Sequence, residues 1–341
     1  MKREWSKDGD IHSLANNVIL NSWEPTDEHT ITEVKDPRLL AAKSASSKYN
    51  KDNPSCDTAT RGPFQQEFWQ AMREELDTLT KKFDCWSLVK RTSEMNVLPS
   101  TWAFKITRYP DGSVKKFKAR FRARGDCQKE GVDYFETWAP IVHWKMIRII
   151  MVLAAKLGLV LVQCDITATF IHGQVPDHEH IYVHQPRGFY KGGKDNVLKL
   201  KHTLYGLKQS PRFFFKYFSD QLIAQELTPS QFDPCLFLST MLIVVIYVDD
   251  ILIYGKTESV IDKFIENMTE RSIALHKEGT AEDYLGVNIK RDGRKIIFTQ
   301  EGLVRQIIQA IGLDTKYSMQ KKCRQQLRLL ERTWTVLQQK G

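Results

Sequence analysis

The sequence predicts an α+β fold that combines antiparallel strands with amphipathic helices. Two apolar, β-branched runs within residues 241–254 flank a pair of adjacent acids, which is the pattern of a buried strand hairpin. Residues 102–124 form two alternating segments around a Pro-Asp-Gly turn, which predicts a second hairpin. Apolar residues recur at helical spacing within residues 63–83 and 211–223. Strands and helices of both kinds are therefore expected.

Composition sets broad limits on the class of protein. The 341 residues suffice for one large domain or two smaller ones, and the net charge of +9 favours a polyanionic partner only mildly. The six cysteines include no Cys-x-x-Cys pair, which argues against a zinc ribbon and a disulfide framework. The N-terminus lacks the apolar core of a signal peptide, and no apolar run approaches the roughly 20 residues of a membrane span. We expect an intracellular protein, in the cytoplasm or the nucleus.

The first part of the chain divides near residue 60. Residues 1–60 are polar, with scattered prolines, and predict a disordered or linker-like leader. An amphipathic helix follows over residues 63–83, with a proline near its first turn, and we expect it to serve packing. A short strand is expected at residues 86–89.

The second strand of the 102–124 hairpin is the most basic stretch of the chain. Its cationic residues occupy every second position, so a strand would carry all of them on one face. A solvated face is the ordinary explanation of such a pattern. We favour contact with phosphates, from a template backbone or an incoming triphosphate. Like charges on one face repel one another unless a polyanion lies opposite them. The residues are Lys116, Lys118, Arg120, Arg122 and Arg124.

The middle of the chain supplies a third acid. A helix is expected over residues 145–156, ended by Gly158. The apolar run after it predicts a buried strand over residues 159–165 that closes on Asp165. A short strand at residues 181–184 and a glycine-rich loop at 186–196 follow.

The remaining elements are helices and strands of ordinary pattern. Ser210 is a plausible N-cap and Pro211 the first residue of a helix, and Thr257 caps another that runs through residue 271. The first of these helices is expected to direct Phe214, Phe218, Leu222 and Ile223 inward. Further expected elements are a strand at 284–289, a turn at 292–293 into a strand at 295–298, a helix at 301–311 and an unassigned basic tail at 313–341.

Three carboxylates sit in similar settings. Asp165 ends one apolar strand, and Asp249 and Asp250 lie at the tip of the 241–254 hairpin. If the two strands are neighbours in one sheet, these acids converge and can bind hard cations such as Mg²⁺. Paired ions serve nucleotidyl transfer and nuclease chemistry alike, so the acids alone leave both reactions open.

The segment Tyr-Val-Asp-Asp resembles the active-site tetrad of reverse transcriptases, and the surrounding chain is similar to the polymerase domain of copia-type retrotransposon polyproteins. One matching block is weak support, whereas six in the order of the family are specific. The resemblance covers about residues 60–312. Its blocks are residues 118–125, 128–140, 164–173, 204–212, 247–250 and 284–286.

The resemblance implies a right-hand polymerase fold with fingers, a palm built on an antiparallel sheet and a partial thumb, over residues 61–312. It implies an RNA-directed DNA polymerase that uses two Mg²⁺ or Mn²⁺ ions, deoxynucleoside triphosphates and an RNA or DNA template-primer. Catalytic acids and metal ligands would be Asp165, Asp249 and Asp250, with the Ile166 carbonyl as a further ligand. Nucleotide-binding residues would be Lys118, Arg120, Phe170, Tyr205 and Gly206, and primer or template residues would be Arg122, Arg124, Tyr247, Leu285 and Gly286.

Phe170 carries a specific implication. From its surroundings in the sequence it is typical of a core residue, but the resemblance sets it under the sugar of the incoming nucleotide. There an aromatic ring would obstruct a 2′-hydroxyl and select deoxynucleotides. Such a role, like the basic strand, has no purpose in a nuclease, which we rank last.

The sequence also departs from the family. Arg122 stands where an aliphatic residue is usual, and Thr169 where a small residue is usual, beside the nucleotide pocket. The polyproteins of the family continue into a ribonuclease H domain, for which this sequence has no counterpart. We therefore keep a second hypothesis, a truncated and inactive relic that only binds nucleic acid. A second copy or other parts of a polyprotein are further candidate partners.

Overall fold

The computed structural model describes most of the chain between residues 52 and 305 and divides it into two compact units. The first unit contains the described residues up to 279, and the second contains those from 283 onward. The first unit contains both helices and strands, and the described elements of the second are strands. The described residues are 11–12, 52–109, 111–279, 283–284, 287–292, 295–300, 302 and 304–305.

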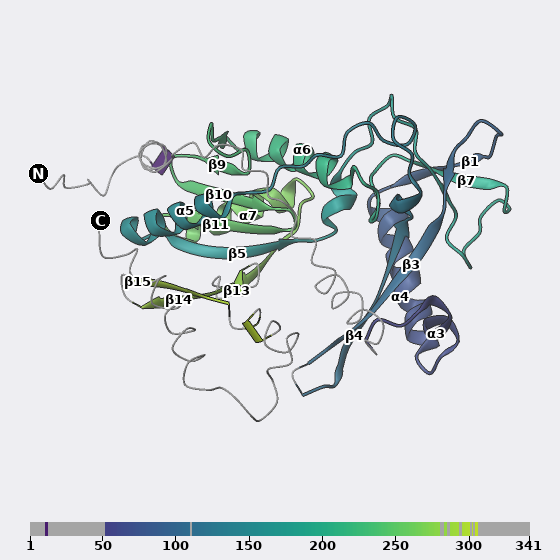
Figure 1. Ribbon diagram of the computed structural model, residues 1–341, viewed down its shortest axis with the longest axis horizontal. Helices are drawn as coiled ribbons and strands as arrows, with labels where there is room; N and C mark the ends of the chain where they lie inside the picture. The colour runs from purple at the N-terminus through teal and green to yellow at the C-terminus, as the bar shows by residue number, and fades with distance from the viewer. Residues whose placement is uncertain are drawn as a thin grey trace, which may run out of the picture. The chain divides into compact units, whose positions relative to one another are not determined.

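A six-stranded antiparallel sheet forms the centre of the first unit, and its central strands run side by side in Figure 1. The two central strands, β10 and β11, are buried along almost their entire length because their residues are apolar on both faces. The 241–254 hairpin is thereby confirmed. In spatial order the strands are β12 (Leu275–Gly279), β5 (Val160–Ile166), β11 (Asp250–Gly255), β10 (Leu242–Tyr247), β9 (Leu236–Leu238) and β8 (Thr228–Pro229).

Helices accompany this sheet. Helix α5 (Trp144–Leu157) ends at Gly158, whose left-handed φ of 67° fits the predicted stop. Helix α7 (Glu258–Glu270) contacts β11 and β12, and its predicted cap is confirmed, because the Thr257 side chain accepts a hydrogen bond from the N–H of Val260.

Helix α6 (Ser210–Ile223) corrects two predictions. Its N-cap is Gln209 rather than Ser210, because the Ser210 hydroxyl donates to the Leu204 carbonyl and Pro211 is only the second helical residue. Ile223 is 51% exposed, since the last helical position turns away from the buried Leu222. Phe214, Phe218 and Leu222 are buried as predicted.

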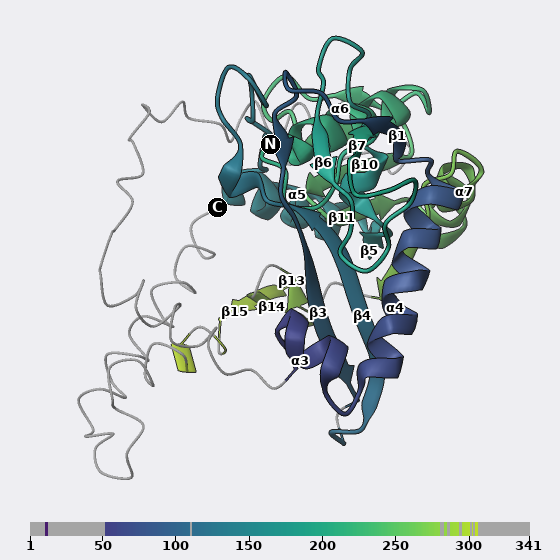
Figure 2. The same cartoon turned by 90° about the vertical axis from the view of Figure 1, so that its right-hand side faces the viewer.

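The long hairpin of β3 (Ser100–Arg108) and β4 (Val114–Ala123) is confirmed, and Figure 2 shows helix α4 (Gln65–Asp77) running along it. Helix α4 packs on β4 and continues as a π-helical turn, Thr78–Lys82. The Asp111 carboxylate accepts hydrogen bonds from the N–H and hydroxyl of Ser113, which closes the turn. Pro110 lies outside the described residues.

The expected leader is wrong at its end. Residues Cys56–Arg61 form helix α3, which contacts β3 and α4 and buries Ala59. Ile11 is also buried. Apart from Ile11 and His12, the residues before 52 lie outside the described part of the chain.

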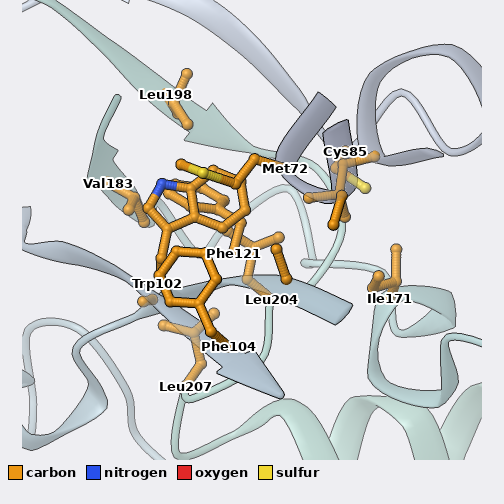
Figure 3. Close-up of a cluster of buried hydrophobic side chains, with 14 of the residues drawn as sticks. Met72, Cys85, Trp102, Phe104, Phe121, Ile171, Val183, Leu198, Leu204 and Leu207 are labelled. Atoms are coloured by element: carbon orange, nitrogen blue, oxygen red, sulfur yellow. The ribbon is translucent and has the colours of Figure 1, made fainter. Parts of the chain in front are cut away.

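A second, four-stranded sheet shares an apolar core with the hairpin and α4. Figure 3 shows part of that core, where Trp102, Phe104 and Phe121 from the hairpin meet Met72 of α4. Packing of these aromatic rings fixes the hairpin to the rest of the unit. The sheet order is β1 (Trp86–Lys90), β7 (Asn196–Leu200), β6 (Tyr182–His184) and β2 (Val97–Leu98).

The second unit is a three-stranded antiparallel sheet, β13 (Asp283–Tyr284), β14 (Val287–Asp292) and β15 (Lys295–Thr299). Strands β14 and β15 pair with each other as predicted, and Gly293 of the predicted turn lies outside the described residues. A single strand at 284–289 is wrong, because β13 folds back and pairs with β14. Residues 302, 304 and 305 are helical, while the rest of the predicted 301–311 helix and the 313–341 tail lie outside the described residues. None of the described helices has the length and apolar character needed to cross a membrane.

Candidate active site

Asp165 and Asp250 face each other directly across two neighbouring strands. Asp165 lies near the end of β5, Asp250 opens β11, and the two residues are register partners in the antiparallel pair. Side chains of such partners lie on the same face of the sheet, about 5 Å apart at their Cβ atoms. The predicted meeting of the two strands is thereby confirmed.

Asp249 enters the site through a tight turn. Tyr247 pairs with Asp250, so only Val248 and Asp249 connect β10 to β11. Val248 has a left-handed φ of 54°, which a β-branched residue rarely adopts. Such a conformation costs about 1–3 kcal/mol and persists only where the surroundings enforce it. Here the paired strands on both sides enforce it and hold Asp249 next to Asp250.

The three acids repel one another. Burial raises the pKa of Asp249, and the charges of Asp165 and Asp250 raise it further, while Arg120 and a hydrogen bond with Thr169 lower it. Burial and Asp165 likewise raise the pKa of Asp250, which a hydrogen bond with Gln163 partly offsets. The site is therefore short of positive charge.

A bound divalent cation would offset the repulsion among the three carboxylates. The Asp249 Oδ1 atom is buried and has no hydrogen-bond partner, which fits an oxygen that awaits a cation. The Ile166 carbonyl, in contrast, accepts a hydrogen bond from the Thr169 hydroxyl at 2.8 Å. In the described part of the chain, no group of three or more histidine, cysteine, aspartate or glutamate side chains is arranged to hold a metal ion. Binding would therefore require the carboxylates to turn toward the ion.

A fourth carboxylate, Glu278, was not predicted from the sequence. Burial and the charges of Asp165 and Asp250 raise its pKa, so it lies within their electrostatic reach. The Gln163 side-chain N–H donates to Glu278 Oε2 at 2.9 Å and is also hydrogen-bonded to Asp250. Strand alternation could have indicated Gln163, two residues before Asp165. Glu278 gave no such signal, because the polar segment Leu275–Gly279 was not expected to form a strand.

The basic face of β4 has the predicted alternation. Its cationic side chains are exposed, whereas Ala119, Phe121 and Ala123 between them are buried. Burial and the neighbouring cations lower the pKa of Lys118, which the charge of Asp165 partly offsets, and Arg120 lowers the pKa of Asp249, so both cations act on the acids. The exposed cations of the strand include Lys116, Lys118, Arg120 and Arg122.

Tyr205 and Gly206 line the free edge of β4 at this point. The N–H of Ala123 donates to the Tyr205 carbonyl at 2.9 Å, and the Tyr205 ring lies 4.9 Å from the Arg120 guanidinium. Gly206 has a φ of 91°, and a Cβ there would lie 2.3 Å from the Ala123 carbonyl oxygen. Only glycine fits this close approach.

Phe170 lies beside Tyr205 rather than inside a closed core. It is half-buried in the short 3₁₀ turn η3 (Thr169–His172), and its ring makes edge contacts with Tyr205 at 5.8 Å and Phe214 at 6.4 Å. This position joins the turn after Asp165 to the loop that borders β4.

The predicted primer and template residues are in different settings. Tyr247 is half-buried beside the acids, and Arg122 is exposed and bridged to the Tyr205 backbone. Arg124 is hydrogen-bonded to Asp126 at 2.6 Å, so its charge is already partly engaged. Leu285 and Gly286 lie outside the described residues.

Comparison with known proteins decides the family. Residues 83–323 match the family described as reverse transcriptase (RNA-dependent DNA polymerase). The chain belongs to this reverse transcriptase family. The predicted resemblance to copia-type elements is confirmed, and the chain carries the RNA-directed DNA polymerase domain of a retrotransposon Pol polyprotein.

The relatives of this reverse transcriptase domain are much longer proteins. The chain is 31% identical to the retrovirus-related Pol polyprotein from transposon TNT 1-94 of Nicotiana tabacum over 290 residues, which is 81% of the chain and 22% of that protein. It is 32% identical to the retrovirus-related Pol polyprotein from transposon RE1 of Arabidopsis thaliana, over 60% of the chain and 14% of that protein. The transposon Ty1-DR1 Gag-Pol polyprotein of Saccharomyces cerevisiae is 26% identical over 66% of the chain and 13% of its own length. The chain thus spans less than a quarter of each.

Proposed function

We propose that this domain extends a primer 3′-hydroxyl on an RNA or DNA template by two-metal nucleotidyl transfer from deoxynucleoside triphosphates. The observation that carries the proposal is the direct pairing of Asp165 with Asp250, next to the buried and unpartnered oxygen of Asp249. In this proposal the six-stranded sheet is the palm, the β3–β4 hairpin with α4 belongs to the fingers, and the second unit begins the thumb.

The acids and the basic face divide the work. Asp165, Asp249, Asp250 and the Ile166 carbonyl would hold two Mg²⁺ or Mn²⁺ ions, which when bound supply Lewis acidity for the attacking hydroxyl and the leaving pyrophosphate. Lys118 and Arg120 would bind the triphosphate, because their charges already reach the acids across the site. The triphosphate would then lie between the cations of β4 and the acids of β5 and β11.

The remaining site residues would select and align the substrates. Phe170, with Tyr205 and Gly206, would border the sugar of the incoming nucleotide and exclude a 2′-hydroxyl. Arg122, Arg124 and Tyr247 would contact the primer or the template, as would Leu285 and Gly286. Other parts of a polyprotein or a second copy would be the protein partners.

Primer extension tests the proposal. The purified chain is given an RNA template, a DNA primer, deoxynucleoside triphosphates and Mg²⁺ or Mn²⁺. Asp249→Asn is expected to abolish extension, whereas Asp220→Asn, on the exposed side of α6, serves as a matched control. Circular dichroism of each variant checks folding. Undiminished extension by a folded Asp249→Asn variant would refute the assigned site.

One observation favours a second candidate, a relic that binds nucleic acid without polymerising. The Thr169 hydroxyl donates its one proton to the Ile166 carbonyl at 2.8 Å, so it competes with a cation for one of the proposed ligands. Salt-dependent binding of a template-primer without extension by the wild-type chain would select this candidate. Extension by the wild-type chain would exclude it.

A further inference from the structure

We infer that Thr203, assisted by His202, is a positioning residue that holds Phe170 in place and so determines how strictly the site rejects ribonucleotides. This inference rests on the proposed function, because it assigns a cause to the sugar selectivity proposed above. Thr203 and His202 follow β7 and lie about 30 positions beyond Phe170 in the chain.

Three contacts from this dipeptide fix the backbone around Phe170. The Thr203 hydroxyl donates to the carbonyl of Phe170 itself. His202 Nδ1 is hydrogen-bonded to the Ile171 carbonyl at 2.9 Å, and the N–H of Thr203 donates to the Gly173 carbonyl at 2.8 Å. The three carbonyls of one short turn are therefore held by two neighbouring residues.

Packing leaves Phe170 as the one side chain of η3 that reaches out of the interior. Thr169, Ile171 and His172 of the turn are buried, and Ile171 belongs to the apolar core (Figure 3). The His172 ring stacks on Tyr217 at 5.7 Å with an interplanar angle of 13°. With its neighbours locked, the direction of the Phe170 ring depends on the backbone that Thr203 holds.

The fit around Thr203 is too close to be incidental. Thr203 is fully buried, and a Cβ added at Gly173 would lie 2.8 Å from its hydroxyl oxygen. Without the hydroxyl, the Phe170 carbonyl would keep only the N–H of Gly173 at 3.2 Å. The loss would loosen the turn at the residue that carries the ring, while the acids on β5 and β11 keep their own pairing.

A matched pair of variants isolates the hydroxyl. Thr203→Val has nearly the same shape but no donor, whereas Thr203→Ser keeps the donor. For each we measure kcat/KM for a deoxynucleotide and for the corresponding ribonucleotide on the same template-primer. Thr203→Val is expected to lower the ratio by about three- to tenfold, the factor that one ordinary hydrogen bond supplies, and Thr203→Ser to stay within about twofold of wild type.

Phe170→Ala separates the possible failures. If the wild type does not extend primers, the proposed function itself is refuted, and the role of Thr203 falls with it. If Phe170→Ala lowers the ratio strongly but Thr203→Val and Thr203→Ser both match wild type, the positioning role of Thr203 is refuted. An equal loss of kcat/KM for both sugars in Thr203→Val would also refute it, because it indicates a purely structural role. Thermal melting of each variant verifies that it is folded.

Discussion

The Glu75 carboxylate of helix α4 accepts a hydrogen bond from the backbone N–H of Phe121 at 3.3 Å. It occupies a place on the free edge of β4 where a further strand would otherwise pair, two residues from the edge contact that Tyr205 makes with Ala123. Burial raises the pKa of Glu75 to about 7, against the lowering effects of this N–H and of Arg120. A helix side chain thus completes the edge of the basic strand.

Glu75 predicts a specific dependence of stability on pH. The usual carboxyl pKa of 4.5 applies to the unfolded chain, so between pH 4.5 and 7 the folded state binds the proton more tightly. The free energy of unfolding should therefore fall by up to about 3 kcal/mol as pH rises through this window. Glu75→Gln should remove that fall and be more stable than wild type at pH 8.

Urea denaturation at pH 4.5, 6 and 8 measures this effect, with the exposed neighbour Glu74→Gln as the matched control. Equal stability differences between Glu75→Gln and wild type at all three pH values would contradict the raised pKa.

Removing one acid of the cross-strand pair should stabilise the chain in the absence of metal. Asp165→Asn eliminates a charge that raises the pKa of both Asp249 and Asp250. We expect its melting temperature in EDTA to rise by about 2–4 °C, which corresponds to about 1 kcal/mol for a domain of this size. Added Mn²⁺ should stabilise wild type but not the variant. A variant that melts below wild type in EDTA would argue against repulsion at the site.

Gln163 should contribute to the stability of the fold, although its side chain is neutral. Gln163→Leu removes a donor shared by Glu278 and Asp250 and leaves two like charges without this common partner. We expect a loss of about 1–3 kcal/mol in the free energy of unfolding. Glu278→Gln, which removes one of the charges, should reduce that loss when the two changes are combined. Additive effects in this double-mutant cycle would show that the residues do not interact.

Arg120 should influence the acids as well as the triphosphate. Its charge lowers the pKa of Asp249, so Arg120→Ala should raise that pKa and move the pH midpoint of Mn²⁺ binding upward. Titration calorimetry with Mn²⁺ between pH 5 and 8 measures the midpoint, and Lys115→Ala on the same strand is the control. An unchanged midpoint in Arg120→Ala would show that the charge of Arg120 does not influence the acids. Arg120→Lys should restore the midpoint but not the stacking on Tyr205.

The elements that local pattern specifies were predictable from the sequence. The apolar runs of β10 and β11 and the alternation of β4 depend only on residue order, and both hairpins formed as expected. The pairing of Asp165 with Asp250 was predictable only as a condition, because it required that two strands separated by more than 80 residues be neighbours.

The errors arose where tertiary contacts override local preference. Ser210 has the chemistry of an N-cap, but the Leu204 carbonyl takes its hydroxyl. Glu278 reaches the acids because β12 pairs with β5, and Glu75 reaches Phe121 because α4 packs on β4. None of these partners is adjacent in sequence, so periodicity could not reveal them.

The left-handed backbone of Val248 lowers thermal stability but helps to position Asp249 for catalysis. Glycine at this position would relax the turn, so Val248→Gly should relieve strain of about 1–3 kcal/mol. The same change would give Asp249 more freedom to move away from its neighbours, since the left-handed valine is the other residue of the two-residue link. Directed evolution for heat resistance alone should therefore accumulate glycine or asparagine at residue 248. Selection for DNA synthesis should instead retain valine, despite its strained backbone.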